Sequence, residues 1–381
     1  MKKVAVIFGG RSCENEISVL TGVFVLNLLD REKYIPIPVY IHTDGMTYTS
    51  PKMTDVGFFR DKKVSEMERV FFHEGCLYAI NGAKRKIKRR EKVDVAINCC
   101  HGGLGEGGGV SALMEWNKIP LASPDLTSSG VFMDKCLTKT VMRGLGVPTV
   151  DYIRVNEEDY EKRGAFLLKR IETRLKYPVV VKPAHLGSSI GITVAKDETE
   201  VKKAIDSAFH LDNRILIEKY LEKKKDVNCA AYALHGQIYV SEPETAFGAG
   251  LYSFEDKYIK RATDGVLRKG ENGAKKEKDG GRYALSKDIR EKIRAYTRTV
   301  YKRMNLSGVV RMDFLVSGEE VYLCEVNTVP GSLAYYLFCE RITDARGFFT
   351  DLIEEAIRQS AKKEKRIIKT GILRTAPKCG K

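Results

Sequence analysis

The chain lacks the residue patterns that mark zinc sites, disulfide frameworks and membrane spans. Its nine cysteines form no CxxC pair and show no spacing with histidine that suits zinc. An odd number of cysteines without a disulfide framework is typical of a reducing cytosol. No apolar run approaches the length of a membrane span. The apolar residues 4–8 are too few for a signal peptide, because Arg11, Glu14 and Glu16 follow at once. We therefore expect a cytoplasmic protein without a membrane partner.

Internal repeats and nucleic-acid-binding patterns are also missing. The net charge of +15 suggests an anionic partner such as a nucleotide, a nucleic acid or a membrane surface. However, the basic residues gather in two runs, 83–92 and 362–381, and such runs are usually solvated faces or mobile chain ends. No recognition helix or aromatic stacking pattern accompanies them. A nucleic-acid partner is therefore disfavoured.

The first 125 residues alternate apolar strands with helices. A hydrophobic content of 43% in 381 residues is enough for the cores of two or three domains. The expected elements are strands at 2–10, 34–45 and 92–100 and helices at 11–29, with Ser12 as N-cap, and at 110–117. Strands that are apolar on both faces and alternate with helices indicate a parallel sheet between helix layers. The loops after the first and third strands should line a crevice at the carboxyl edge of this sheet.

The rest of the chain has a different pattern. Residues 126–225 are expected to form a smaller α+β module, and residues 226–360 a third unit, followed by a basic tail at 361–381. The expected elements of the middle module are a helix at 128–148, a β-hairpin at 177–197 with a glycine–serine tip, a helix at 199–209 and a strand at 214–221. Residues 260–282 have almost no apolar periodicity, which is typical of a surface loop or lid.

One candidate anion site lies at the hairpin tip. Lys182 ends the apolar strand of the hairpin, and Gly187, Ser188, Ser189 and Gly191 follow. Glycines let backbone N–H groups approach an anion closely, and a fixed ammonium beside them completes a phosphate cradle. The lysine precedes the glycines, so this is not the common GxxxxGK[ST] loop. An ordinary hairpin with a solvent-reaching lysine is the alternative.

A second candidate site lies on the last two strands. Antiparallel pairing through the turn "SGEE" can bring Asp313 against Glu325 and Asn327, with Arg311 on the same face as Asp313. Two carboxylates close together repel unless a cation lies between them. The oxygen ligands suit Mg²⁺ bridging nucleotide phosphates, and the arginine could stabilise transferring phosphoryl charge. A surface ladder of salt bridges is the alternative, although the apolar flanks argue against much exposure.

Eight short motifs occur in the order that one enzyme family shows. They are "FGGRSCENEIS", "HGGLGEGG", "MDK", "VVKPAHLGSSIG", "IEKYL", "EDKY", "VRMDF" and "EVNTVPG". From residue 1 to about 355 the chain resembles the D-alanine–D-alanine ligases of the ATP-grasp superfamily. The resemblance implies an α/β ATP-grasp fold. The N-terminal domain would be Rossmann-like, and the nucleotide would be held between the central and C-terminal α+β modules.

The resemblance also implies a role for each matching residue. The residues expected to bind ATP are Lys135, Lys182, Ser188, Ser189, Glu218, Lys219, Leu221, Asp226 and Lys257. Among them, the two lysines at 135 and 182 would hold phosphates and residues 218–221 would border the adenine. Asp226 would contact the ribose, where the family usually has glutamate. Asp313, Glu325 and Asn327 would bind two Mg²⁺ ions, for which Mn²⁺ can substitute.

The residues expected at the amino-acid substrates and the reacting groups are Glu14, His101, Ser188, Tyr258, Arg311, Gly331, Tyr336 and Leu337. Glu14 would receive the ammonium of the first substrate and form a hydrogen-bonded trio with Ser188 and Tyr258. His101 would lie near that substrate's carboxylate. Arg311 and the Gly331 backbone N–H would stabilise the developing negative charge. Taken singly, His101 could only cap a turn, Glu14 could only favour a helix N-terminus, and Tyr258 could only pack.

The implied reaction joins two D-alanine molecules for peptidoglycan precursor synthesis, with ATP and small D-amino acids as partners and a homodimer as the common assembly. Three alternatives stay open: a ligase with another acceptor such as D-serine or D-lactate, a more distant ATP-grasp enzyme, and a basic nucleic-acid-binding protein on a degenerate fold. One departure from the family favours the first. After "PG", a serine and the next backbone N–H usually grip the second substrate. Here Tyr336 replaces that serine and Leu337 supplies the N–H.

Overall fold

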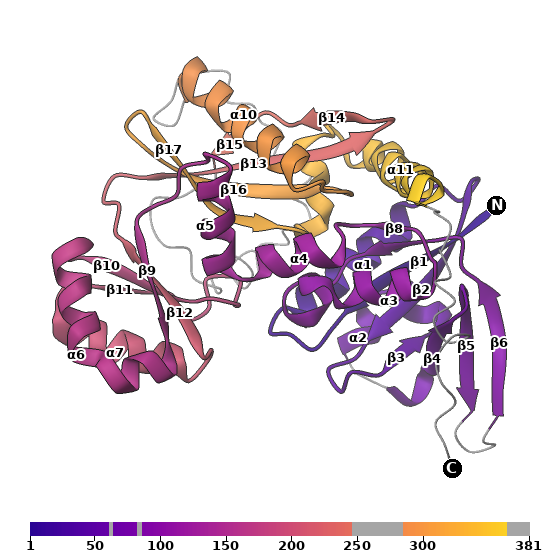
Figure 1. Ribbon diagram of the computed structural model, residues 1–381. Coiled ribbons are helices and arrows are strands. Elements are labelled where there is room, and N and C mark those ends of the chain that lie inside the picture. The colour runs from indigo at the N-terminus through magenta and orange to yellow at the C-terminus, as the bar shows by residue number, and fades with distance from the viewer. Residues whose placement is uncertain (61–63, 82–85, 246–284, 364–381) are drawn as a thin grey trace, which may run out of the picture.

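The computed structural model describes residues 1–60, 64–81, 86–245 and 285–363, and three sheets follow one another along this chain (Figure 1). The lid expected at 260–282, with Lys257 and Tyr258 before it, lies outside the described residues. None of the helices in the described part of the chain combines the length and the hydropathy that crossing a membrane requires.

The first sheet has eight strands in the order β6-β5-β4-β3-β2-β1-β7-β8. Its unit comprises β1 (Lys2–Gly9), α1 (Asn15–Leu28), β2 (Tyr34–Ile41), β3 (Thr47–Thr49), η1 (Pro51–Thr54), α2 (Gly57–Arg60), η2 (Val64–Glu66), β4 (Glu68–His73), β5 (Cys76–Asn81), β6 (Lys86–Lys92), β7 (Val95–Asn98), the π-helix η3 (Gly105–Gly109), α3 (Val110–Trp116) and β8 (Leu121–Ala122). The parallel sheet expected from the sequence is present only in part. Strands β2, β1, β7 and β8 are parallel, whereas β3 to β6 add an antiparallel half that the sequence reading missed.

Both faces of the parallel half are buried, as the apolar strands predicted. Val4, Val6 and Phe8 of β1 pack with α1 and with the C-terminal helix α11 (Ala345–Lys363). Ala5 and Ile7 point the other way and pack with α3. The helix α1 begins at Asn15, so the prediction of Ser12 as its N-cap is wrong. Ser12 instead accepts a hydrogen bond from the backbone N–H of Glu14 and donates to the carbonyl of His101, which ties the loops after β1 and β7 together.

The second sheet is antiparallel, with the order β11-β10-β12-β9. Its unit comprises α4 (Leu126–Met133), α5 (Lys135–Gly144), β9 (Tyr152–Asn156), α6 (Glu157–Arg174), β10 (Val179–Pro183), β11 (Thr193–Ala195), α7 (Glu198–Phe209) and β12 (Arg214–Lys219). The hairpin and the strand at its side are confirmed. The single helix expected at 128–148 is wrong, because it is broken at Asp134. That side chain accepts from the N–H groups of Cys136 and Leu137, and so begins a second helix.

Helices α6 and α7 cover one face of this second sheet. Apolar side chains such as Val179, Val181 and Ile215 pack against α6 and α7. The opposite face carries Lys182 and Glu218, and α5 lies beside it (Figure 1). The second face is therefore the one that can bind a polar ligand.

The third sheet has the order β14-β13-β16-β17, with β15 paired to β13. Its unit comprises β13 (Lys225–Leu234), β14 (Gln237–Val240), β15 (Glu244–Thr245), α10 (Lys287–Arg303), β16 (Val310–Ser317), β17 (Glu320–Asn327), η6 (Gly331–Leu337), η7 (Ile342–Asp344) and α11. Helix α10 packs on an apolar face formed by residues such as Cys229, Met312 and Leu323. The other face carries Arg311 and Asp313, which are only partly buried.

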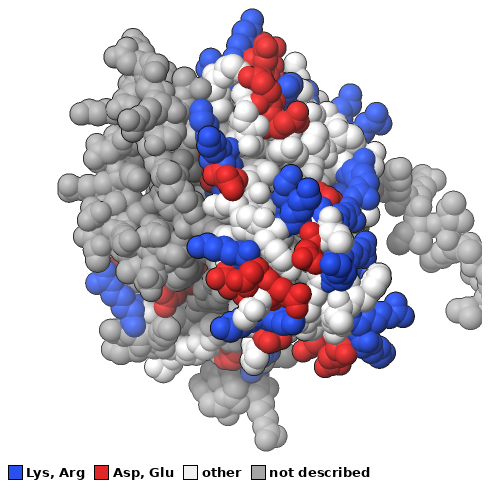
Figure 2. Space-filling model, turned by 90° about the vertical axis from the view of Figure 1, so that its left-hand side faces the viewer, with Lys and Arg blue, Asp and Glu red and all other residues white. Residues whose placement is uncertain are grey.

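The positive charge does not form a continuous patch on the face that carries α6 and α7. Figure 2 shows acidic and basic side chains interspersed there. Residues 86–92 of the first basic run form the exposed edge strand β6, so this part is a solvated strand and not a mobile end. Charged side chains on an edge strand discourage pairing with another chain.

Candidate active site

The three units meet around one cavity of about 110 Å³. It is lined by parts of α1, the loop after β7, the start of α5, the hairpin tip and the facing strands β16 and β17. The residues predicted from the sequence that line it are Glu14, His101, Lys135, Ser188, Arg311, Glu325, Asn327 and Gly331. A larger hollow of about 940 Å³ lies between α6 and α7 and is lined by none of them. The smaller cavity is therefore the candidate active site.

Glu14 and Ser188 come from different units and meet directly. Glu14 directly precedes α1, and the Ser188 hydroxyl donates a hydrogen bond to its carboxylate. Two glycines make room for this carboxylate. A Cβ on Gly102 would lie 2.5 Å from Glu14 Oε2 and one on Gly187 would lie 2.9 Å from it, closer than Cβ contacts allow. The glycines of both motifs thus let two loops close on one buried carboxylate.

His101 is held by protein groups at both ring nitrogens. Nδ1 lies 2.7 Å from the carbonyl oxygen of Val329, and Nε2 lies 2.8 Å from the hydroxyl of Thr21. A carbonyl only accepts, so Nδ1 carries the proton and Nε2 accepts from Thr21. Burial lowers the pKa of His101 to about 4, so the ring is neutral at pH 7. Thr21 also accepts from the backbone N–H of Ser332, so His101 and Thr21 connect the first unit to the segment after β17.

Glu106 lines the cavity and was not predicted as a site residue, although it belongs to the motif "HGGLGEGG". Its carboxylate accepts from the backbone N–H groups of Gly102, at 2.8 Å, and Val329, at 3.2 Å. Burial raises its pKa to about 7, and the nearby negative charge of Glu14 acts in the same direction. The one acidic residue among the glycines of "HGGLGEGG" was the available signal.

Lys135 joins the start of α5 to the hairpin tip. Its ammonium donates to the carbonyl of Leu186 and lies 4.0 Å from Glu325 Oε2, and its backbone N–H donates to the carbonyl of Ala184. The lysine is therefore directed at the carboxylate of the third sheet from across the cavity.

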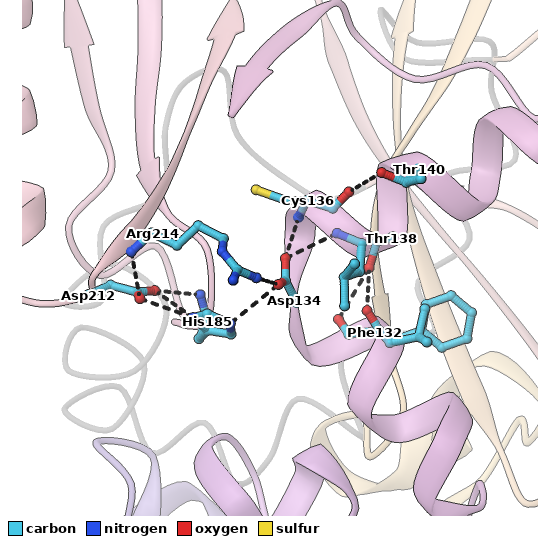
Figure 3. Close-up of polar contacts among 10 residues, drawn as sticks. Phe132, Asp134, Cys136, Thr138, Thr140, His185, Asp212 and Arg214 are labelled. Carbon is cyan, nitrogen blue, oxygen red and sulfur yellow. Dashed lines mark hydrogen bonds and ion pairs between the residues drawn. The ribbon is translucent and has the colours of Figure 1, made fainter. Parts of the chain in front are cut away.

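A charged cluster lies at the N-cap of α5, where Figure 3 shows Asp134, His185, Asp212 and Arg214 together. His185 lies between Asp212, 3.0 Å from Nδ1, and Asp134, 3.4 Å from Nε2, and Arg214 donates to Asp134. Hydrogen bonds that its ring donates to Asp134 and Asp212 raise the pKa of His185 to about 9. The imidazolium thus connects the hairpin tip to the capped end of α5.

Lys182 pairs with a buried carboxylate on the neighbouring strand. Its ammonium forms an ion pair with Glu218, and Glu218 also pairs with Lys139 at 2.6 Å. Burial alone would raise the pKa of Glu218, but the two ammoniums outweigh it and lower the pKa to about 2. Lys139 was not predicted from the sequence, because nothing in a helical pattern distinguishes it from a solvent-exposed lysine.

The predicted pairing of β16 and β17 is confirmed. Asp313 lies directly opposite Glu325, and Arg311 lies opposite Asn327. Arg311 donates two hydrogen bonds of 2.8 Å to the Asp313 carboxylate, and the Asn327 amide nitrogen donates to Asp313 at 3.1 Å. The amide oxygen of Asn327 then remains as a ligand atom.

A β-bulge shapes this site. The register shifts after Asp313, so that Phe314 pairs with Leu323 and Cys324 is the extra residue. Val321, Leu323 and Val326 are buried, whereas Cys324 and Glu325 are both only partly buried. Cys324 Sγ lies 3.9 Å from Lys182 Nζ. The bulge therefore directs two consecutive side chains toward the facing sheet, where strict alternation would allow one.

The donor set of the third sheet has the chemistry of a hard-cation site. Two carboxylates and an amide oxygen on one face are the ligands that Mg²⁺ prefers. Within the described ranges, no three His, Cys, Asp or Glu side chains lie together so that they could hold a metal by themselves. The amide oxygen of Asn327 therefore has to supply the third ligand beside the two carboxylates. The residues present fit Mg²⁺ better than zinc.

The segment after β17 contains the predicted second-substrate residues. Gly331 lines the cavity, and the Tyr336 hydroxyl accepts a hydrogen bond of 3.3 Å from Arg311. Leu337 is half-buried against the core of the first unit. Ser332, Leu333 and Ala334 all have φ near +50°, a region that non-glycine residues avoid. Tyr336 therefore reaches the same arginine that holds Asp313.

The remaining predicted residues lie elsewhere. Ser189 is in the hairpin tip with φ of +61°. Lys219 is exposed at the end of β12, Leu221 is half-buried, and Asp226 accepts from Lys224 at 2.9 Å. None of these four lines the cavity described above.

Comparison with known proteins agrees with this architecture. A family model described as the D-ala D-ala ligase N-terminus matches residues 3–124, and one described as the D-ala D-ala ligase C-terminus matches residues 141–358. The chain is 30% identical to the D-alanine–D-alanine ligase of Thermosipho melanesiensis, with 97% of this chain and 96% of that protein covered. It is 31% identical to the ligase of Caldicellulosiruptor bescii, over 95% and 96%.

A solved structure matches as well. The crystal structure of D-alanine–D-alanine ligase from Helicobacter pylori superposes with a TM-score of 0.73 at 26% identity, covering 96% of this chain and all of that one. The match extends over all three units and shows that the fold is ATP-grasp. The chain belongs to the D-alanine–D-alanine ligase family.

Proposed function

We propose that the protein is an ATP-dependent ligase that joins two D-alanine molecules into D-alanyl-D-alanine, with release of ADP and phosphate, for peptidoglycan precursor synthesis. The observation that carries the proposal is the convergence of Glu14, Ser188, Arg311 and Glu325 on one cavity. These residues come from three different units of a chain in this family, and packing alone gives no reason to collect polar groups there.

The first half of the reaction forms an acyl phosphate. The ammonium of the first D-alanine pairs with Glu14, which Ser188 orients. The substrate carboxylate attacks the γ-phosphate of ATP, and ADP leaves. Lys135 and Lys182 balance the phosphate charge, and Arg311 stabilises the charge that spreads over the transferring group. His101 positions the segment after β17 through its hydrogen bond to the Val329 carbonyl. Because both ring nitrogens are already hydrogen-bonded within the protein, other donors have to bind the substrate carboxylate.

The second half forms the peptide bond. The amine of the second D-alanine attacks the acyl carbon, and the oxyanion of the tetrahedral intermediate accepts hydrogen bonds from Arg311 and the Gly331 N–H before phosphate leaves. Water would hydrolyse the acyl phosphate. The site therefore has to exclude bulk water at this step.

Asp313, Glu325 and Asn327 are the residues that would hold Mg²⁺. Held there, it would supply positive charge that neutralises the phosphates during transfer. Two ions, or Mn²⁺ in their place, are compatible with an oxygen-only donor set.

A product assay tests the proposal. Purified protein is incubated with Mg²⁺ and ATP and with D-alanine, L-alanine, D-serine or D-lactate, and both phosphate release and product mass are measured. We expect D-alanine to give phosphate and a dipeptide, and Glu14→Gln to abolish both. Glu16→Gln is the matched control, since Glu16 is an exposed carboxylate on the same helix turn. ATP binding without phosphate release for any D-amino acid would exclude the ligase.

The second candidate is the same chemistry with a different acceptor. The contact between Tyr336 and Arg311 favours it, because a phenol occupies the position expected of a serine. The phenol oxygen extends several ångströms farther from its backbone than a serine hydroxyl, so the second substrate would bind in a different place. The same panel distinguishes the two candidates through the mass of the product.

We also place the reaction in the cytoplasm, where ATP is available, and in a homodimer. Light scattering of the purified protein tests the assembly, and a monomer mass would exclude the dimer. A nucleic-acid partner finds no support in the mixed charges of the face shown in Figure 2.

A further inference from the structure

The pair between Lys139 and Glu218 is the most completely buried ion pair among those described in this structure. Side-chain exposure is 1% for Lys139 and 3% for Glu218. The ammonium of Lys139 also donates to the carbonyl of Val150 at 3.1 Å and lies 5.2 Å from the ring centre of Tyr152. Burying a charge this deeply costs free energy unless every partner is in place. The reaction described above gives Lys139 no role, so the pair requires another explanation.

Strand geometry explains how Glu218 comes to have two lysines. In the register of β10 and β12, Val180 pairs with Glu218 and Lys182 pairs with Leu216, so Lys182 and Glu218 project from the same face. Tyr152 of β9 lies opposite Glu218 on that face. Lys139 reaches it from α5, one turn after Lys135. Glu218 is therefore paired with one ammonium from its own sheet, that of Lys182, and with one from α5, that of Lys139.

The two lysines differ in access to a ligand. Lys182 is 10% exposed, and its ammonium lies 3.9 Å from Cys324 Sγ of the third sheet. Phosphate oxygens can compete with Glu218 for it. Lys139 is enclosed by Val150, Tyr152 and Glu218, so a phosphate cannot reach it. When a nucleotide attracts Lys182, Glu218 keeps Lys139 as its fixed counter-ion.

We propose that Lys139 is a positioning residue that keeps Glu218 ionised and oriented to accept the exocyclic amine of adenine, so that the pair sets a preference for ATP over GTP. The inference rests on the proposed function, in which Glu218 borders the adenine. An ionised carboxylate only accepts hydrogen bonds. The 6-amino group of adenine donates one, whereas the 6-oxygen of guanine is itself an acceptor and would face the carboxylate unpaired.

Removal of Lys139 should relax this preference. The buried carboxylate then loses one of the two charges that keep it ionised, and a protonated carboxyl group can donate to the 6-oxygen of guanine. A hydrogen bond to a charged group corresponds to about a 10- to 100-fold change in affinity. We expect Lys139→Met to weaken ATP binding by at least about tenfold and to lower the ratio of ATP to GTP affinity by a similar factor.

Calorimetric titration of the full chain with ATP and with GTP, in the presence of Mg²⁺, tests the proposal. Lys139→Arg should restore part of the preference, because it retains the charge. Lys169→Met is the matched control, since Lys169 forms an exposed pair with Glu172 on α6. If circular dichroism shows that Lys139→Met is unfolded, the double variant Lys139→Met/Glu218→Gln takes its place. It removes the unpaired carboxylate and should bind both nucleotides with similar affinity.

Each outcome has a defined meaning. A folded Lys139→Met, or a folded double variant, with the wild-type ratio of affinities overturns the inference and leaves the proposed function standing. Wild-type protein that prefers ATP but makes no dipeptide overturns the proposed function and leaves the nucleotide preference standing. Wild-type protein that binds neither nucleotide overturns both.

Discussion

The cluster around His185 should make the stability of the protein depend on pH above neutrality. The imidazole lies between the carboxylates of Asp134 and Asp212, and the Arg214 guanidinium also pairs with Asp134. Those carboxylates raise the pKa of His185 from 6.5 to about 9. We predict that His185→Gln, which retains a donor but not the charge, destabilises the protein near pH 6 and has little effect near pH 10.

The sign follows from the direction of the shift. A histidine whose pKa is raised by folding contributes its full stabilisation below the pKa of about 6.5 that it has in the unfolded chain. This contribution declines between the two pKa values and is lost as the pH rises through about 9. The stabilising window therefore includes neutral pH.

The magnitude follows from the shift and the exposure. A rise of the His185 pKa from 6.5 to about 9 would correspond to about 3 kcal/mol of folding stability if the imidazole were fully shielded from water. The imidazole is 40% exposed, so solvent screening reduces this contribution to about 1–2 kcal/mol. His185→Gln should therefore lower the free energy of unfolding by that amount near pH 6.

Urea unfolding at a series of pH values, followed by circular dichroism, measures the effect. His210→Gln is the matched control, because the His210 imidazole hydrogen-bonds the carbonyl oxygen of Asp206 and not a carboxylate. The difference between wild type and His185→Gln should shrink as the pH rises, and His210→Gln should show no such trend. An equal loss at every pH would mean that His185 acts through packing or a neutral hydrogen bond, and would refute the reasoning.

Three further predictions concern the cavity. Glu325→Gln should lower turnover by about 10²–10³ with the fold intact, because it weakens the site that would hold Mg²⁺ and so the positive charge that neutralises the phosphates, and unchanged turnover at saturating Mg²⁺ would remove Glu325 from the site. Gly187→Ala should raise the Michaelis constant for the first D-alanine, because the new Cβ would lie 2.9 Å from Glu14 Oε2, and unaltered kinetics would show that the loop has room to move. Tyr336→Ser should lower the Michaelis constant for the second D-alanine if the phenol displaces that substrate, and a higher constant in steady-state kinetics would make the tyrosine a working ligand.

The sequence predicted the elements whose apolar pattern is long and regular. It located the strands at 2–10 and 34–45, the hairpin around Lys182 and the pairing of Asp313 with Glu325. It missed the antiparallel half of the first sheet, because β3 is only three residues long and β6 is almost wholly exposed. Neither strand shows the alternation on which a strand prediction depends.

The candidate site was predicted in part for similar reasons. Residues in short motifs between glycines could be found, whereas Lys139 could not, because its function depends on a contact with Glu218 that is 79 positions away in the sequence. The break of the helix at Asp134 was missed as well. Aspartate inside a helical pattern is unremarkable until its side chain is seen to cap a second helix.

The bulge at Cys324 determines where this strand can change length over evolutionary time. Buried and partly exposed side chains alternate up to Leu323 and again from Glu325 onward, but in opposite phases. The extra residue at 324 lies where the phase changes. Loss of the codon for Cys324 would leave Val326 facing the core and Glu325 opposite Asp313, because Leu323, Glu325 and Val326 would then alternate regularly. Loss of a codon before Leu323 or after Glu325 would instead exchange the two faces beyond the deletion. We therefore expect lineages of this enzyme to differ in whether they carry a residue at 324 and to keep the length of the strand on either side of it constant.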